Sequence, residues 1–210
     1  VSALSCVIVA VLLSIMNRNT NSKLSNAQVE FAKLGYAIPG AVIAVGVLIP
    51  AGWIDNQLNL LTSAWFQKSI GLVVSGSLSL LIFAYIVRFL SVSIQTVESG
   101  LSSIKPNIDE SAYCLGASRL KVTKQIHLPL LRSSLVTAFI LVFVDVLKEL
   151  PATLILRPFN FNTLAVRTYE LASDERLMDA ALPALTIVVI GLLPIICILR
   201  TMEKQQISNE

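Results

Sequence analysis

Long apolar runs alternate with short polar stretches along the whole chain. The apolar runs cover residues 1–16, 36–54, 69–90, a stretch that begins near Ser133, and residues 180–199. A helix needs about 20 apolar residues to cross the hydrocarbon core of a bilayer. Because lipid offers no hydrogen bonds to the backbone, such runs are expected to be helices. The pattern therefore predicts an all-α membrane protein with about five transmembrane helices.

The first apolar run is shorter than the ~20 residues that a span needs. It starts at Val1 without an initiator methionine or a basic leading segment, so a secretory signal is not expected. We interpret the chain as a fragment of a longer protein that is cut within a span. Residues 1–210 are expected to form a single transmembrane domain.

The stretches between the first three runs predict a short helix and a loop. Ser25 followed by Gln28 fits a capping box, which indicates an interfacial helix over residues 25–36. Residues 55–68 are predicted as a polar loop that carries Trp65 and Phe66 as interfacial aromatics. In the third run, small residues recur every fourth position and would let another helix approach closely. These small residues are Gly71, Ser75 and Ser79.

Composition supports the membrane class and excludes several others. Hydrophobic residues make up 55% and charged residues 14% of the chain, whereas soluble domains have roughly 25% charged residues. The net charge of +3 is scattered, so nucleic-acid binding is not expected. The three cysteines form no CxxC pair and predict neither a disulfide framework nor a metal site. The single histidine, His127, is expected at the surface.

One polar stretch, residues 109–129, reads DESAYCLGASRLKVTKQIHLP and predicts two short helices joined at a glycine. Asn107 or Asp109 is expected to cap the first helix. Gly116 permits the left-handed backbone that ends one helix and turns into the next. Ser118 is expected to cap the second helix, and Pro129 to stop it before the next span.

The distribution of basic residues gives an orientation. If residues 109–129 are cytoplasmic, 11 of the 16 Lys and Arg residues lie inside, four lie outside, and Lys148 falls within a span. This bias agrees with the positive-inside rule and places the C-terminus in the cytoplasm.

Charged residues near the end of the fourth run are the candidate pathway or gate. They are Asp145, Lys148 and Glu149, followed by Pro151. Asp145 and Lys148 are three residues apart and share a helix face, so an ion pair is expected, with Glu149 on the same side. Three interpretations stay open: a structural ion pair, groups that line or gate a translocation path, or a helix that ends near residue 147 and leaves the charges wet.

The polar stretch resembles the cytoplasmic EAA loop of permease subunits of ATP-binding-cassette importers. It matches the pattern E-[SA]-A-x3-G-x9-I-x-L-P, with Ser111 where the family usually has alanine. The matching residues are Glu110, Ser111, Ala112, Gly116, Ile126, Leu128 and Pro129. The resemblance implies a type I importer permease fold in which residues 105–130 form a cytoplasmic loop with a coupling helix.

Two further runs are similar to permeases of the ferric-iron importer group, which includes thiamine-type relatives. They are GYAIPGAVIAVGVLIP, from Gly35, and the segment that starts DVLKELPATL at Asp145 and extends into the last span. In that group two permease halves are often fused, so the chain looks like a C-terminal half.

The resemblance implies a membrane subunit of an ATP-driven importer in the bacterial inner membrane, with ferric iron as the expected cargo and thiamine or sulfate as alternatives. The chain has no GxxxxGK[ST] segment, so ATP and magnesium are expected on a separate ATPase and no cofactor or catalytic residue on this chain. Further expected partners are a second permease half, fused or separate, and a periplasmic substrate-binding protein.

Asp145 and Glu149 also suit two other function classes. A membrane-embedded enzyme would use Asp145 and Glu149 as an acid–base pair, and an ion-coupled secondary transporter would use them as proton carriers. Residues 157–179 carry Tyr169 and several carboxylates, which are ligand types suited to ferric iron. We favour a solvated face that docks the binding protein.

Overall fold

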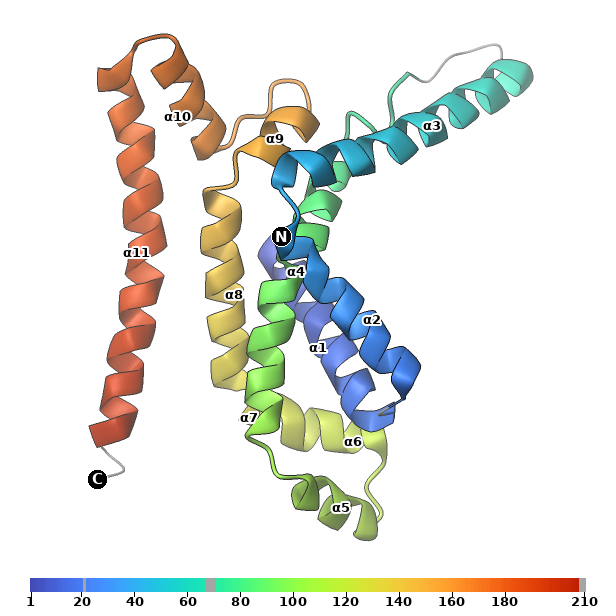
Figure 1. Cartoon of the computed structure of the whole chain (residues 1–210), viewed down its shortest axis with the longest axis vertical. Helices are drawn as coiled ribbons and strands as arrows, with labels where there is room; N and C mark the ends of the chain where they lie inside the picture. Colours follow the sequence, from blue (N-terminus) through green and yellow to red (C-terminus); the bar gives the residue numbers. More distant parts are fainter. Residues whose placement is uncertain (21, 67–70, 208–210) are drawn as a thin grey trace. The chain divides into compact units, whose positions relative to one another are not determined.

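The computed structural model describes residues 1–20, 22–66 and 71–207 (Figure 1). Regular structure in these ranges is entirely helical, so the all-α prediction is confirmed. The longer helices are α1 (Ser2–Thr20), α2 (Lys23–Lys33), α3 (Gly40–Phe66), α4 (Leu78–Ser102), α8 (Arg132–Leu147), α10 (Leu164–Ser173) and α11 (Leu177–Ile207). The shorter ones are η1 (Leu34–Ala37), α5 (Pro106–Cys114), α6 (Arg119–Val122), η2 (Thr123–His127), α7 (Leu128–Leu130) and α9 (Pro151–Leu156).

The chain forms two compact units, and each is built from separate stretches of sequence. The first comprises residues 1–37 and 89–143. In this unit α1 lies beside α2, and α5 and α6 are neighbouring short helices beyond the end of α4 (Figure 1). Apolar side chains from α1, α2 and α4 form the core, together with residues that flank the short helices. These buried residues are Ala10, Ile15, Val29, Ile94, Val97, Leu101, Ile104 and Leu131.

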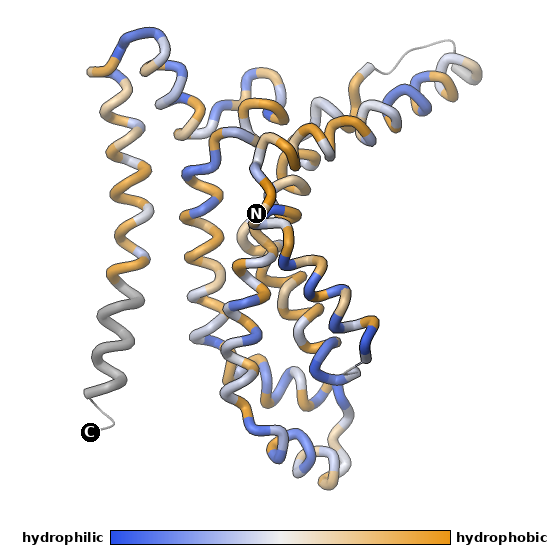
Figure 2. The backbone as a smooth tube through the Cα atoms, viewed as in Figure 1, coloured by the Kyte–Doolittle hydropathy of each residue, from blue (hydrophilic) through white to orange (hydrophobic). Residues whose placement is uncertain are grey.

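The second unit comprises residues 38–88 and 144–210. Here α3 packs on α9, and α10 packs on α11. Helix α11 continues through Pro183 and Pro194, and its described part is apolar over most of its length (Figure 2). Bilayer-facing helices are apolar on their exposed sides, which accounts for the many exposed leucine, isoleucine and valine side chains of α11.

Within the part of the chain that the structure describes, four helices are long and apolar enough to cross a membrane. They are Ser2–Thr20, Gly40–Ala64, Leu78–Ser102 and Leu177–Ile196. A fifth span results if Arg119–Leu130 and Arg132–Leu147, which meet at a bend of 69°, count as one broken span. The prediction of about five transmembrane helices is therefore confirmed.

The boundaries of the second and third spans differ from the prediction. Helix α3 continues to Phe66, so the polar loop expected over residues 55–68 was wrong. Asp55 does not end the helix because its carboxylate accepts three backbone N–H groups from Val73, Val74 and Ser75, at 3.0, 2.7 and 2.8 Å. A buried carboxylate with that many donors has its hydrogen-bonding needs met inside the fold.

Helix α4 begins at Leu78, later than expected. Gly71 has φ +76° and Ser75 lies in the non-helical segment that returns along α3, so the predicted stripe of small residues on one helix face is absent there. Helix α2 begins earlier than expected, because Ser22, not Ser25, accepts the capping hydrogen bond, from Ser25 N. The side chains of Trp65 and Phe66, expected as an interfacial pair, lie outside the described residues.

Candidate functional site

The first helix of the EAA-like stretch is α5, which starts with a proline. Pro106 occupies its first turn, and the N-cap residue Lys105 provides no side-chain hydrogen bond, so the predicted cap at Asn107 or Asp109 was wrong. Proline suits this position because it lacks the N–H that would otherwise have no partner. Glu110 and Ser111 are exposed, whereas Ala112 is buried against the unit. Helix α5 therefore presents one polar face outward.

Gly116 forms the turn that was expected. Its φ is +78°, its N–H donates to Tyr113 O at 2.9 Å, and no atom lies within 4 Å of where a Cβ would be. Glycine is thus required by the left-handed backbone and not by crowding. Ser118 then caps α6 by accepting a hydrogen bond from Lys121 N, as predicted.

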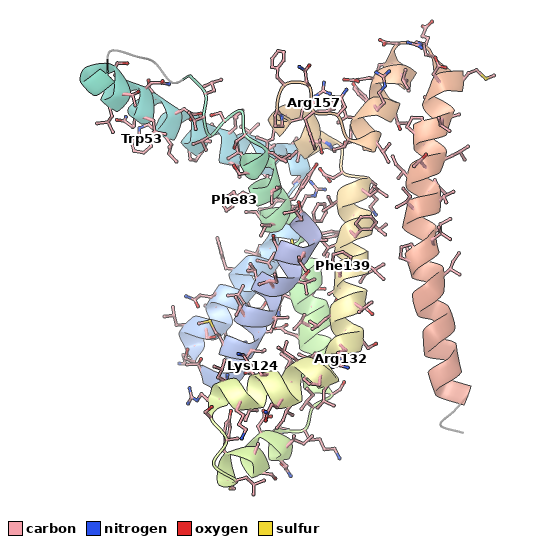
Figure 3. All side chains as sticks on the ribbon, turned by 180° about the vertical axis from the view of Figure 1, so that it is seen from behind. Trp53, Phe83, Lys124, Arg132, Phe139 and Arg157 are labelled. Atoms are coloured by element: carbon pink, nitrogen blue, oxygen red, sulfur yellow. The ribbon has the colours of Figure 1, made fainter. Side chains whose placement is uncertain are left out.

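Pro129 does not stop the second helix. Helix α6 continues through the π-helical segment η2 into α7, where Leu128 N still donates to Thr123 O. The wider π turn accommodates a proline that cannot donate its own backbone hydrogen bond. The chain breaks at Leu131 and bends by 69° into α8, close to Arg132 (Figure 3). Ile126 and Leu128 are half-buried, and Pro129 is exposed.

The tip of this stretch is apolar as well as exposed. Leu115 is 87% exposed, Leu120 is 65% exposed, and Tyr113 is 39% exposed. These residues lie within four positions of Gly116 along the chain, and Glu110 in the preceding helix is exposed as well. Exposed apolar side chains gathered on a polar segment are typical of a surface that another protein covers.

His127 is not at the surface, so that prediction was wrong. The side chain is fully buried, and its Nε2 lies 2.8 Å from Asp109 Oδ1. Because a carboxylate oxygen only accepts, Nε2 is the atom that carries the proton and donates. The second oxygen, Oδ2, accepts from Arg18 Nε at 2.8 Å. Asp109 on α5 is therefore bound by side chains from α1 and η2.

These contacts change the acidity of Asp109. Partial burial on its own raises the pKa of the carboxyl group, but hydrogen bonds from His127 and Arg18, together with their charge, outweigh burial and lower the pKa. The carboxylate is thus the favoured form wherever this cluster is intact.

The charged residues after the fourth span separate into two groups. Asp145 and Lys148 form the expected ion pair at 2.9 Å, in which the lysine side chain is 63% exposed and the aspartate 14%. Helix α8 ends at Leu147, as the third interpretation expected, but the side chains of Asp145 and Glu149 are only 14% and 6% exposed and so are not solvated as that interpretation required. Glu149 is not part of the Asp145–Lys148 pair. Its side chain is 6% exposed and lies 3.4 Å from Arg88 Nε, joining the α8–α9 break to α4.

Glu149 also organises the short helix α9. Its Oε1 accepts from Ala152 N at 3.2 Å, and its backbone carbonyl accepts from Thr153 Oγ1 at 2.7 Å. Thr153 in turn lies 2.5 Å from Tyr85 Oη on α4. Pro151 begins α9 instead of disturbing α8, since the helix has already ended. At Gly40, the start of α3, a Cβ would overlap the Arg88 guanidinium and lie 2.5 Å from Glu149 Oε1.

A second polar cluster follows α9. The Arg157 guanidinium contacts Asn162 Oδ1 and lies 2.8 Å from Glu170 Oε1, next to a cavity of about 370 Å³ (Figure 3). Phe159 is fully exposed beside it. Arg167 also approaches Glu170, at 3.6 Å, so this carboxylate is already neutralised by two arginines. No three His, Cys, Asp or Glu side chains among the described residues are grouped as a metal site requires.

Sequence reasoning missed the partners of both buried carboxylates. Arg18 and Arg88 entered it only as basic residues near the ends of spans. The signal that was available is that Arg88 lies within the apolar run 69–90 and Arg18 lies two residues beyond the run 1–16. A charge at that depth requires a partner.

Comparison with known proteins identifies the family of the chain. Residues 7–205 match the family described as binding-protein-dependent transport system inner membrane component. FbpB 2, an Fe(3+)-transport system permease protein of Haemophilus influenzae, is 26% identical over 160 residues, which cover 76% of this chain and 28% of the relative. PhnV of Salmonella paratyphi A, named for a 2-aminoethylphosphonate transport system, is 28% identical over 173 residues, covering 82% of this chain and 57% of the relative. The chain thus spans little more than a quarter and just over half, respectively, of these relatives.

The fold is also shared with a solved importer. A chain in the crystal structure of a bacterial ABC transporter involved in the import of the polysaccharide alginate has a TM-score of 0.71 at 16% identity. The match covers 97% of this chain and 77% of that one. At this identity the likeness concerns the fold alone, which is that of an importer permease. Because the family model matches nearly the whole chain, this protein belongs to the family of binding-protein-dependent transport system inner membrane components.

Proposed function

We propose that this chain forms part of the membrane pathway of an ATP-driven importer and that its EAA-like loop receives movement from a separate ATPase. The observation that carries the proposal is the exposed tip of that loop. Leu115 and Leu120 are largely exposed on a glycine-hinged pair of short helices, next to the exposed Glu110. Exposed apolar side chains on a polar segment outside the predicted spans support a docking surface for another protein.

The ATPase would bind the loop while ATP and magnesium stay on that subunit, since this chain lacks the phosphate-binding loop. Nucleotide binding would favour one of two arrangements of the ATPase pair and draw the loop with it. This is alternating access driven by different affinity of the nucleotide for two states. In this orientation the C-terminus is cytoplasmic, and the bacterial inner membrane holds the chain.

The α8–α9 break is assigned to the translocation pathway. Helix α8 stops at Leu147, and Pro151 starts α9, so the backbone between them is irregular. Irregular backbone at membrane depth occurs where protein or a water-filled cavity surrounds it. Asp145, Lys148 and Glu149 would line or gate that passage.

The remaining partners follow from the same assignment. A second permease half, fused or separate, would complete the pathway. A periplasmic substrate-binding protein would dock on the face formed by Arg157, Phe159 and Glu170. In support, a related alginate importer was solved with a periplasmic protein bound to its substrate.

Ferric iron is the proposed cargo, because relatives named for ferric transport match most of the chain. 2-Aminoethylphosphonate is a second candidate, because relatives named for its transport match a longer part of the chain.

The test is reconstitution of the full-length protein with its ATPase and binding protein in proteoliposomes. Uptake of ferric iron would be measured beside uptake of 2-aminoethylphosphonate, thiamine and sulfate, with and without ATP. We expect ATP-dependent uptake of iron, abolished by Gly116→Pro, since proline cannot adopt positive φ. The variant Gly76→Pro lies outside the loop and serves as the matched substitution.

Uptake of another solute that still requires ATP and Gly116 would support the proposed importer function but reject ferric iron as the cargo. Uptake that proceeds without ATP would reject the proposed function and favour an ion-coupled transporter.

A further inference from the structure

The attachment of α5 to the rest of its unit depends on few side chains. Within Pro106–Cys114 only Ala112 is buried, and most other side chains are exposed. Burial of apolar surface therefore contributes little to holding α5 in place. The strongest described contacts that reach it are the two hydrogen bonds to the carboxylate of Asp109.

Arg18 connects this carboxylate to two other helices at once. It extends from the last turn of α1, and its Nε donates to Asp109 Oδ2 at 2.8 Å. Nη1 donates to Leu101 O at 2.6 Å, and Nη2 donates to Ile104 O at 2.9 Å. Carbonyls at a helix C-terminus lack partners within the helix, and a guanidinium supplies donors in a fixed plane. Arg18 thereby joins the ends of α1 and α4 to α5.

His127 holds the other oxygen from the opposite element. Its Nε2 donates to Asp109 Oδ1 at 2.8 Å, and its ring is fully buried in η2. The π-helical register of Thr123–His127 places this ring next to the position where the chain bends into α8. The two carboxylate oxygens of Asp109 thus connect α5 to α1 through Arg18 and to η2 through His127.

We propose that Arg18 and His127 are positioning residues that make α5, η2, α1 and α4 move as one body when the coupling loop is pulled. This role rests on the proposed function, in which the loop receives movement from the ATPase. Arg18 and His127 themselves are not among the residues that match the EAA-like pattern. Without the two contacts, α5 is attached mainly through the short connections at residues 103–105 and 115–118. Displacement of the loop would then be absorbed by those connections before it reached the spans.

The chain offers a matched control in the same unit. Lys33 on α2 pairs with Glu98 on α4 at 2.8 Å, and the side chains are 21% and 30% exposed. Arg18 and Asp109 are similarly buried, at 18% and 13% exposed. The Lys33 pair also links two helices but does not touch the coupling loop. The variant Lys33→Gln therefore removes a comparable ion pair without the proposed role.

The experiment uses the full-length permease assembled with its ATPase and binding protein. Hydrogen exchange of the α5 amides is measured without nucleotide, and the ratio of solute imported to ATP hydrolysed is measured in proteoliposomes. Arg18→Gln and His127→Leu are expected to raise α5 exchange about tenfold or more, the effect of losing a hydrogen bond to a charged group. Both should lower the import ratio, whereas Lys33→Gln leaves both readouts near wild type.

His127→Gln provides the rescue, because the glutamine Nε2 can replace the histidine Nε2 as the donor. It should lie closer to wild type than His127→Leu in both readouts. Unchanged α5 exchange in Arg18→Gln would overturn the proposal, as would an equal loss of import ratio in Lys33→Gln. A wild type that imports nothing with ATP would refute the proposed function. A wild type that imports, with an unaltered ratio in Arg18→Gln, would refute the positioning role alone.

Discussion

Helices α5 and α9 are two versions of one local design. Each begins with a proline, Pro106 in α5 and Pro151 in α9, and each has a buried or partly buried carboxylate near its start. In α5 this is Asp109, bound by an arginine from α1. In α9 it is Glu149, which pairs with Arg88 from α4.

The two helices differ in what surrounds them. In α9, Ala152, Thr153 and Leu156 are at most 1% exposed, so one side of the helix is buried in its unit, while Pro151 and Ile155 are exposed. Helix α5 buries one small side chain and leaves its polar face and apolar tip outside. The same kind of carboxylate–arginine contact therefore holds α9, which is packed into its unit on one side, and α5, which is mostly exposed. Loss of one partner should cost more stability at Glu149, which is more deeply buried, than at Asp109.

The largest expected effect on stability is at Glu149, the more deeply buried of the two carboxylates. Glu149→Leu should destabilise the protein by about 3 kcal/mol, because it leaves the Arg88 charge in a buried setting. The double variant Arg88→Leu/Glu149→Leu should cost less than Glu149→Leu alone, since no single charge is left behind. Thermal unfolding of the protein in detergent, followed by circular dichroism, measures both. A double variant that loses the sum of the single losses would remove the pairing argument.

The next effect compares two glycines that are required for different reasons. Gly40→Ala should cost about 2–3 kcal/mol, because the new methyl group pushes apart Arg88 and Glu149. Gly116→Ala should cost only about 1 kcal/mol of local backbone strain, with no clash. Unfolding midpoints of the two variants, measured side by side, check the order. Equal losses would indicate that the space at Gly40 is not filled as described.

A smaller effect is expected at the exposed ion pair. Lys148→Ala should change stability by less than about 1 kcal/mol, because an ion pair with an exposed partner is largely screened by solvent. A clear loss of transport in this variant, with stability nearly unchanged, would indicate that Lys148 acts in the pathway. Lys148→Arg, which keeps the charge, is the control for that measurement.

The smallest effect is a pH dependence at α5. Burial raises the pKa of Asp109, but the bonds from His127 and Arg18 prevail, so the folded pKa lies below the unfolded one. A lowered folded pKa means that the stabilisation is present above the unfolded pKa, about 3.9, and is lost as the pH falls through the folded value. Asp109→Asn should therefore show a smaller drop in unfolding temperature than wild type between pH 6 and pH 3. A drop of the same size in both would contradict the assignment.

Patterns of local sequence predicted the helical class, the number of spans and the turn at Gly116 because each depends on neighbouring residues. Hydrophobic runs define spans by length, and a glycine two residues before a potential capping serine indicates the turn between two helices. The Asp145–Lys148 pair was predictable for the same reason, as its members are one helical turn apart.

Contacts between distant residues were not predictable in this way. Asp55 looked like the start of a loop because its three backbone partners lie 18 to 20 residues further along the chain. Asp109 and Arg18 are 91 residues apart, and nothing local to either indicates the other. The burial of His127 arises from the same cluster. Glu149 was predicted only to share a helix side with Asp145, whereas tertiary packing joins it to Arg88.

The positive φ at Gly116 determines whether an L-residue or a D-residue fits position 116 better. Its backbone has positive φ and open space around the missing side chain, so an L-residue is opposed by its own backbone and by nothing else. A D-residue prefers the mirror-image region, which is the one occupied here. A protein assembled chemically with D-alanine at position 116 should thus keep the loop intact where L-alanine strains it. Chirality alone would distinguish the two molecules, which have the same composition.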